Sequence, residues 1–146
     1  MDIQQSRLMQ QFLIDAGLGT SVASASDWPV YATFLPDEGN IDDDAVVCYD
    51  TAGKTNGRIL ATGEHVEHPG FQVLVRSANR SEGWTKAKAI ANAIDAVFKT
   101  VVTVAGADYT LQNLSRTGHV LDVGSEPEGR HRKFHSINGL MTVSKN

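Results

Sequence analysis

Two stretches of the chain carry apolar residues at the three- and four-residue spacing of an amphipathic helix. The first predicted helix covers residues 3–16, with an apolar stripe of Leu8, Met9, Phe12, Leu13 and Ala16. Asp2 is the expected N-cap, and Gly17 stands where many helices end in a left-handed residue. The pattern predicts a helix that packs one face on the core.

The second predicted helix covers residues 81–99. Ser81 is its expected N-cap, and Glu82 complements the positive end of the helix dipole. We predict that Trp84 and Phe98 belong to the hydrophobic core. The apolar stripe comprises Trp84, Ala87, Ala91, Ile94 and Phe98, broadened by Ile90 and Val97, whereas Lys86 and Lys88 are expected in solvent.

Strand-forming residues dominate most of the remaining chain. The two longest irregular stretches are 36–44 and 50–70. Helices among runs of strands predict an α+β fold: a mostly antiparallel sheet with two main helices packed on one face, plus projecting loops or hairpins. No repeat or linker divides the chain, so residues 1–146 are expected to form a single domain. The predicted strands are 28–35, 45–50, 71–76, 101–104, 109–114, 119–123 and 134–143. Residues 101–104 could instead close the second helix, and a turn or bulge at Asn138 and Gly139 interrupts the last strand.

Composition narrows the class of protein. The formal charge of −4, from 13 basic and 17 acidic residues, disfavours a globally basic nucleic-acid binder. Cys48 is the single cysteine, so neither an intramolecular disulfide nor a cysteine-based zinc site is expected. The N-terminus has no basic start followed by an apolar run, and no stretch approaches the ~20 apolar residues of a membrane helix. We therefore expect a soluble protein without a secretory signal.

Two motifs suggest ligand binding but lack the required context. Gly53, Lys54 and Thr55 resemble the end of a phosphate-binding loop, which needs a glycine where Cys48 stands and a helix immediately afterwards. Asp42, Asp43 and Asp44 place three carboxylates together, but the spacing of a calcium loop is missing. A hairpin loop and a solvated acidic loop are the better interpretations.

The histidines give no convincing metal or catalytic site either. His65 and His68 are three apart and precede Pro69, so no helix holds them in zinc-binding geometry. His131 and His135 share a face if their segment is extended, yet neighbouring basic residues would repel a cation, which favours a solvated or interface patch. No serine stands on a glycine elbow. We expect no enzyme activity, no metal and no cofactor.

One segment resembles a known protein family. Residues 69–76 read PGFQVLVR and precede the alanine-rich second helix, an order similar to that of tail-terminator or tail-completion (minor capsid) proteins of long-tailed bacteriophages. The segment 130–138 stands where relatives carry an arginine, a phenylalanine and an asparagine at related spacing, although His135 and Gly139 depart from that pattern. The departure puts the length of the closing strand in doubt.

The resemblance implies a structural virion protein of the tail or neck, assembled in the host cytoplasm. Members form a homo-oligomeric ring, a hexamer, that caps the tail tube, stops its polymerisation and joins it to the head connector or stopper protein. The resemblance implies the α+β fold, no cofactor, no catalysis and no membrane contact, and DNA that passes through the ring without specific binding. A head-completion or minor capsid protein of the neck remains open, as does a small cytosolic ligand-binding domain or enzyme.

The irregular stretches supply the candidate interface residues. The acidic stretch contains Asp42, Asp43 and Asp44, and the longer stretch carries two basic residues and two histidines. Their opposite character suggests contact between neighbouring subunits, or an acidic ring lumen that does not retain DNA. Ordinary solvated loops are the other interpretation. The basic candidates are Lys54, Arg58, His65 and His68.

Overall fold

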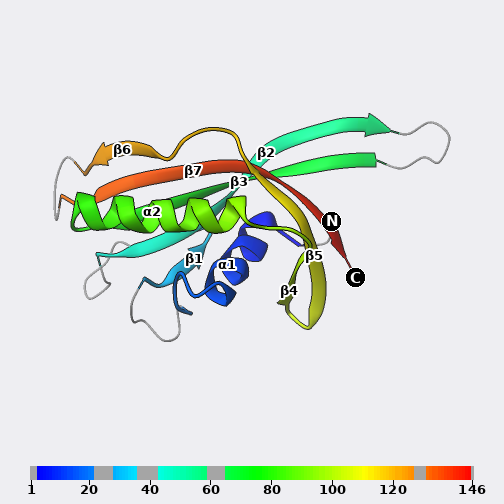
Figure 1. The fold of residues 1–146 in the computed structure, drawn as a ribbon, viewed down its shortest axis with the longest axis horizontal. Coiled ribbons are helices and arrows are strands. Elements are labelled where there is room, and N and C mark those ends of the chain that lie inside the picture. Colours follow the sequence, from blue (N-terminus) through cyan, green and yellow to red (C-terminus); the bar gives the residue numbers. More distant parts are fainter. Residues whose placement is uncertain (1–2, 22–27, 36–42, 59–64, 127–130, 146) are drawn as a thin grey trace.

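The computed structural model describes residues 3–21, 28–35, 43–58, 65–126 and 131–145. It contains two helices and a seven-stranded sheet in the order β1-β2-β3-β7-β5-β4, with β6 also paired to β7 (Figure 1). All strand pairs are antiparallel except β1 with β2, so the predicted α+β architecture is confirmed. The elements are α1 (Gln5–Asp15), β1 (Val30–Ala32), β2 (Ala45–Arg58), β3 (His65–Ser77), α2 (Arg80–Asp95), β4 (Thr100–Val104), β5 (Ala107–Arg116), β6 (Leu121–Ser125) and β7 (Lys133–Lys145).

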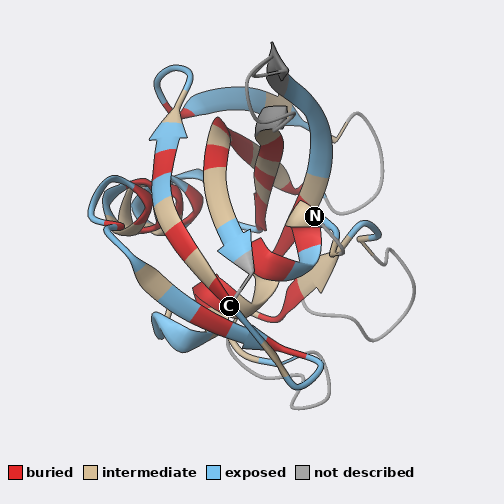
Figure 2. Ribbon diagram, turned by 90° about the vertical axis from the view of Figure 1, so that its right-hand side faces the viewer, coloured by how far each residue is buried: buried red, intermediate tan, exposed pale blue. Residues whose placement is uncertain are grey.

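The core lies between the two helices and one face of a curled sheet. Alternate residues of the paired strands face the helices, and Figure 2 shows buried positions alternating with more exposed ones along the strands. Burying this face against two amphipathic helices supplies the main favourable free energy of folding. The core includes Leu8, Met9, Phe12 and Leu13 from α1, Ala87, Ile90, Ala91 and Ile94 from α2, and Val46, Cys48, Phe71, Val73, Val75, Leu111, Ile137 and Met141 from the sheet.

Helix α1 agrees with its predicted stripe and C-terminus but not with its predicted start. It begins at Gln5, and its N-cap Gln4 makes no capping hydrogen bond through its side chain. The expected cap, Asp2, lies outside the described residues. Gly17 follows the helix with φ of +75°, the left-handed conformation predicted for it.

Helix α2 is shorter than predicted, and this changes which residues are buried. The side chain of Asn79, not Ser81, caps it by accepting from the N–H groups of Ser81 and Glu82. The helix ends at Asp95, so Phe98 no longer follows the helical repeat and is 75% exposed.

Trp84 is also outside the core, with 44% exposure, because it sits on the flank of the buried face while Gly83 and Ala87 are buried. The prediction that Trp84 and Phe98 belong to the core is therefore wrong. Lys86 is half-buried instead of fully solvated, because its Nζ donates to the carbonyl oxygen of Leu18 at 2.9 Å. The burial of Trp84 and of Lys86 is set by the segments that pack beside α2, and the helical repeat does not reveal these.

Strand β7 continues through Asn138 and Gly139, where a turn or bulge was predicted. Both residues keep their pairing with β3, and Gly139 lies opposite Phe71. A Cβ on Gly139 would stand 2.5 Å from Cζ of Phe71 and 2.6 Å from the carbonyl oxygen of Ser115. The glycine therefore makes room for the buried Phe71 ring within a continuous strand.

Candidate assembly surfaces

The stretch predicted to be a long irregular segment is mostly a β-hairpin. The second half of β2, residues 51–58, pairs with the first half of β3, residues 65–70. Together these two segments project beyond the rest of the sheet (Figure 1). We call these two segments the arm. The prediction of an irregular 50–70 stretch is therefore wrong, whereas a projecting hairpin was one of the expected features. Residues 59–64 lie outside the described part of the chain.

Two glycines allow the strands to cross closely at the base of the arm. Gly53 has φ of +65°, and a Cβ there would overlap the backbone of His68. Gly70 faces it, and the register shifts between Thr51 and Lys54. Such an irregularity bends a two-stranded ribbon and increases its twist. The glycine pair thus sets the direction in which the arm leaves the sheet.

The basic candidate residues all fall on the arm. Lys54 pairs with His68 and Arg58 with His65 across the two strands. His68 also contacts β7, with 3.2 Å between its Nδ1 and Oγ1 of Thr142. The structure therefore brings Lys54, Arg58, His65 and His68 together on one element.

Two of the acidic candidate residues, Asp43 and Asp44, accept hydrogen bonds from other residues of the same subunit. The carbonyl oxygen of Asp43 accepts from Nε of the buried Arg76 at 3.0 Å, and the Asp44 carboxylate accepts from the N–H of Ala78 at 3.1 Å. These contacts tie the start of β2 to the end of β3. Asp42 lies outside the described residues. Asp43 and Asp44 consequently have structural partners that the sequence did not indicate.

A buried ion pair closes the connection between β6 and β7. Nη2 and Nε of Arg132 donate to the two carboxylate oxygens of Glu126 at 2.6 and 3.0 Å, and the backbone N–H of Arg132 donates to the same carboxylate. The Arg132 side chain is only 5% exposed, and Nη1 lies 4.0 Å from Oδ1 of Asp43. Burial lowers the pKa of Arg132, so this guanidinium depends on its bidentate partner.

His135 is buried beneath the first turn of α2. Nδ1 has no hydrogen-bond partner among the described residues, and Nε2 lies 3.9 Å from the Asp122 carboxylate, which pairs with Arg80 at 3.0 Å. Trp84 packs edge-on against the imidazole with 5.9 Å between ring centroids. A Cβ on Gly83 would approach Nδ1 to 3.1 Å, so the glycine permits this close packing. The extended-strand pair of His131 and His135 does not form, because His131 precedes β7 with φ of +53°.

The free energy of unfolding is expected to fall as the pH drops below about 6.5, partly because of His135. Burial lowers the pKa of His135 below its ordinary value of 6.5; Asp122 opposes this and Arg80 adds to it. The unfolded chain then binds a proton that the folded protein resists, so stability present above pH 6.5 is lost as the pH falls toward the lower folded pKa.

Chemical denaturation at about pH 7.5 and about pH 5.5 measures this linkage. The variant His135→Gln should lose less stability between the two pH values than the parent protein. His119→Gln, at an exposed position, is the matched control and should keep the parent's pH dependence. An identical pH dependence in all three proteins would contradict the assignment.

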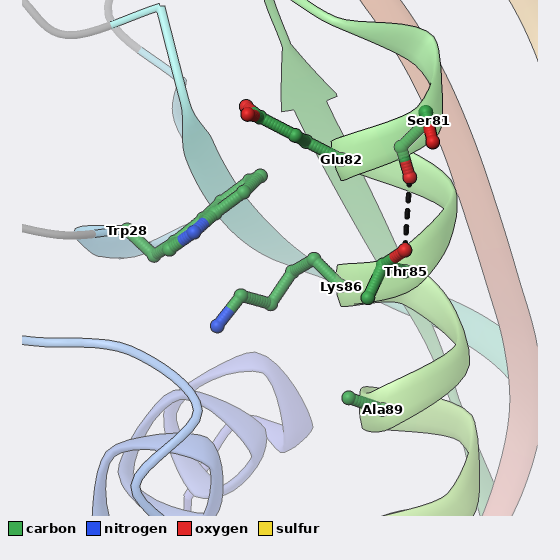
Figure 3. A pocket seen from close by; sticks show the side chains of 6 residues that line it. All are labelled: Trp28, Ser81, Glu82, Thr85, Lys86 and Ala89. Carbon is green, nitrogen blue, oxygen red and sulfur yellow. Dashed lines mark hydrogen bonds between the residues drawn. The ribbon is translucent and has the colours of Figure 1, made fainter.

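An open groove runs between Trp28 and the first half of α2. It has a volume of about 470 Å³ and is lined by Trp28, Ser81, Glu82, Thr85, Lys86 and Ala89 (Figure 3). Nζ of Lys86 lies 5.1 Å from the centroid of the Trp28 ring. Sequence reasoning missed this groove, since Trp28 was expected in a strand and Glu82 only at a helix start.

Several apolar side chains are exposed at other places on the surface. Phe98 and Val101 lie around the link from α2 to β4, and Leu121 and Val123 lie on β6. Single exposed apolar residues are common in folded proteins. The pattern of residues 119–123 predicted a strand, and β6 forms there. No element of the described part of the chain covers Leu121 and Val123, so these two side chains stay exposed.

The metal-binding and nucleophilic side chains considered from the sequence do not come together into a site within the described residues. No group of three or more metal-ligating side chains occurs among them. Burial raises the pKa of the Cys48 thiol, which disfavours the reactive thiolate. In the same part of the chain, neither helix is long and apolar enough to cross a membrane.

Comparison with known proteins identifies the family. A family model described as bacteriophage tail terminator protein matches residues 12–113. One solved structure, of a protein whose name states no function, is similar over 80% of each chain with 18% identity and a TM-score of 0.41. The comparison with curated proteins gives no significant match. Because the family match spans more than half of the sequence, this chain belongs to the bacteriophage tail terminator family, whose members are structural proteins of the phage tail.

Proposed function

We propose that this protein forms a ring, hexameric as the resemblance implies, that caps the phage tail tube. The ring ends polymerisation of the tube protein and joins the tail to the connector or stopper of the head. DNA passes through the lumen without specific binding, and assembly takes place in the host cytoplasm. The observation that carries this proposal is the tail-terminator family match, which covers the end of α1, all of α2, strands β1 to β4 and most of β5.

The projecting arm supports a ring. A cyclic assembly needs two different surfaces on each subunit, one that reaches out and one that receives. A two-stranded hairpin is at best marginally stable alone in water, so an arm outside the main sheet gains stability from a partner surface. We assign Lys54, Arg58, His65 and His68 to this contact because all four lie on the arm.

Among the acidic residues, Asp42 is the best candidate for the lumen or the subunit interface. The Asp44 carboxylate already serves the fold by accepting from the N–H of Ala78, and the Asp43 carboxylate lies 4.0 Å from Nη1 of the buried Arg132. Reversing the charge of all three residues together would therefore disturb the subunit itself. Asp42→Lys alone is the sharper test of an acidic assembly surface.

Electron microscopy of the purified protein, alone and mixed with growing tail tubes, tests the proposed function. We expect rings, tube ends capped by one ring, and a halt in elongation when the protein is added. Asp42→Lys should keep the circular dichroism of the parent while assembling poorly or retaining DNA. Parent protein that leaves tube ends bare and elongation unchanged would contradict the proposal, and normal assembly of Asp42→Lys would remove that residue from it.

A further inference from the structure

Strand β4 leaves one edge of the sheet open. It is the last strand at one end of the sheet order, and among the described residues it pairs only with β5 (Figure 1). A two-residue turn at 105–106, with φ of +52° and +79°, joins the two strands. Val104 and Ala107 flank this turn as a hydrogen-bonded pair, so every second residue of β4 bonds to β5. The N–H and C=O groups of Val101 and Thr103 therefore point to the open side.

The open edge of β4 lacks the features that normally prevent a further strand from pairing. Edge strands of soluble proteins are blunted by charged side chains, proline, bulges or a covering segment. Strand β4 reads TVVTV, which is β-branched throughout and has no charge and no proline, and its register with β5 is unbroken. Phe98, just before the strand, is 75% exposed, and Val101 is 54% exposed. This edge therefore suits the addition of another strand.

The other edge strands, β1 and β6, and the arm each carry such protective features. Strand β1 has three residues, and its Val30 N–H already donates to the carbonyl oxygen of Thr20 at 3.0 Å. Strand β6 has a register shift after Asp122, whose carboxylate pairs with Arg80. The arm has two register shifts and includes Pro69. Between two copies of the chain, β4 against β4 is consequently the pairing that meets none of these obstacles.

We propose that the open edge of β4 pairs antiparallel with β4 of a second copy and so joins two sheets into one. The register that uses every outward N–H and C=O group places Val101 opposite Thr103 of the partner subunit, with the two-fold axis at Val102. Because the strand carries no charge, the two identical edges do not repel each other. The pairing also removes part of the exposed Val101 surface from water.

This contact goes beyond the ring proposed above. A two-fold contact closes with two copies, whereas a ring repeats a contact between two different surfaces of the subunit. The five residues of β4 are far fewer than the ~20–30 residues a side of a standard interface, so the pairing is expected to be weak and concentration-dependent. It shields an edge that would otherwise pair with other extended chains before the subunit reaches a tail tube.

Disulfide trapping tests the register of the contact. A mixture of the Val101→Cys and Thr103→Cys variants should form a covalent dimer under air oxidation, because Cα atoms of directly opposite residues lie about 5.5 Å apart, within reach of a disulfide. Val101→Cys alone is the control and should give little dimer, since its two copies are diagonal neighbours about 7–8 Å apart. The native Cys48 is buried and does not compete. A mixture without covalent dimer, or an equal yield from Val101→Cys alone, overturns the proposal.

A proline variant tests the outward hydrogen bonds. Thr103→Pro removes an outward N–H without breaking a bond to β5, so at high protein concentration the mean mass from light scattering should fall toward half that of the parent. Thr103→Val keeps the N–H and should match the parent, and both variants lose the hydroxyl that donates to Asp108. Denaturant unfolding checks that each variant is folded.

The two proposals fail in different ways in this experiment. Thr103→Pro with the parent's mass overturns the β4 contact, and so does a loss of tube capping at unchanged mass, because β4 then receives a strand of the tube. A halved mass with normally capped tube ends supports the contact and leaves the ring proposal standing. A parent protein that traps the covalent dimer but caps no tubes overturns the ring alone.

Discussion

Truncating Phe71 to alanine is expected to lower the free energy of unfolding by about 3–5 kcal/mol. The Phe71 side chain is fully buried, and its ring fills the space over Gly139 on the neighbouring strand. Removing it deletes apolar contacts and leaves a cavity that the rigid strands on both sides cannot close. A loss of this size is a large part of the ~5–15 kcal/mol that stabilises a typical domain.

Phe98→Ala is the matched control, because it removes the same atoms from a side chain that is 75% exposed. Its cost should stay within about 0.5 kcal/mol. Phe71→Leu, which keeps most of the buried volume, should cost about 1 kcal/mol and remain measurable if the alanine variant does not fold. Denaturant unfolding of the purified variants gives the values. Equal losses for Phe71→Ala and Phe98→Ala would contradict the placement of the core.

Removing the carboxylate of Glu126 should cost about 3 kcal/mol, the second large effect. Arg132 would then keep a buried positive charge without its bidentate partner, and the more distant Asp43 at 4.0 Å compensates little. The free energy of unfolding of Glu126→Ala measures this cost. Replacing both partners, by Glu126→Met with Arg132→Met, should recover most of it, since two apolar side chains leave no buried charge unpaired.

The pair of Arg116 and Asp95 provides the comparison. It has a similar distance of 2.7 Å, but the Asp95 side chain is 46% exposed. Hydrogen bonding to Arg116 lowers the pKa of Asp95, yet water screens the exposed pair. Asp95→Ala should therefore cost less than about 1 kcal/mol. If Glu126→Ala were no worse than Asp95→Ala, the β6–β7 connection would not depend on the buried ion pair.

For function, the sequence was informative through one segment and its context. The motif at residues 69–76 followed by an alanine-rich helix indicated a tail terminator, and the family match confirms it. The individual site residues could not be judged in the same way. Asp43 and Asp44 looked like surface charges, but the Asp44 carboxylate accepts from the N–H of Ala78 and the Asp43 carboxylate lies 4.0 Å from the buried Arg132.

Residue spacing alone determined the existence and type of most elements. Alternating apolar residues predicted β3 and β5, and the stripe of α1 predicted its buried face, because these patterns reflect the two-residue and 3.6-residue repeats of a strand and a helix. The α+β class followed from their order along the chain. These features are local in sequence, so local reasoning reaches them.

The tertiary structure alone decided three features that these repeats do not predict: the arm, the continuity of β7, and the exposure of two aromatic residues near α2. The arm pairs residues of low strand propensity, such as Gly53 and Lys54, because two strands that are already aligned in the sheet continue to pair beyond it. The strand at Asn138 and Gly139 continues because Phe71 from a distant segment covers the glycine. Phe98 is exposed because α2 ends at Asp95, and Trp84 is exposed because it sits on the flank of the buried face. Each of these outcomes depends on contacts between residues far apart in the chain, which the spacing of residues along the sequence does not encode.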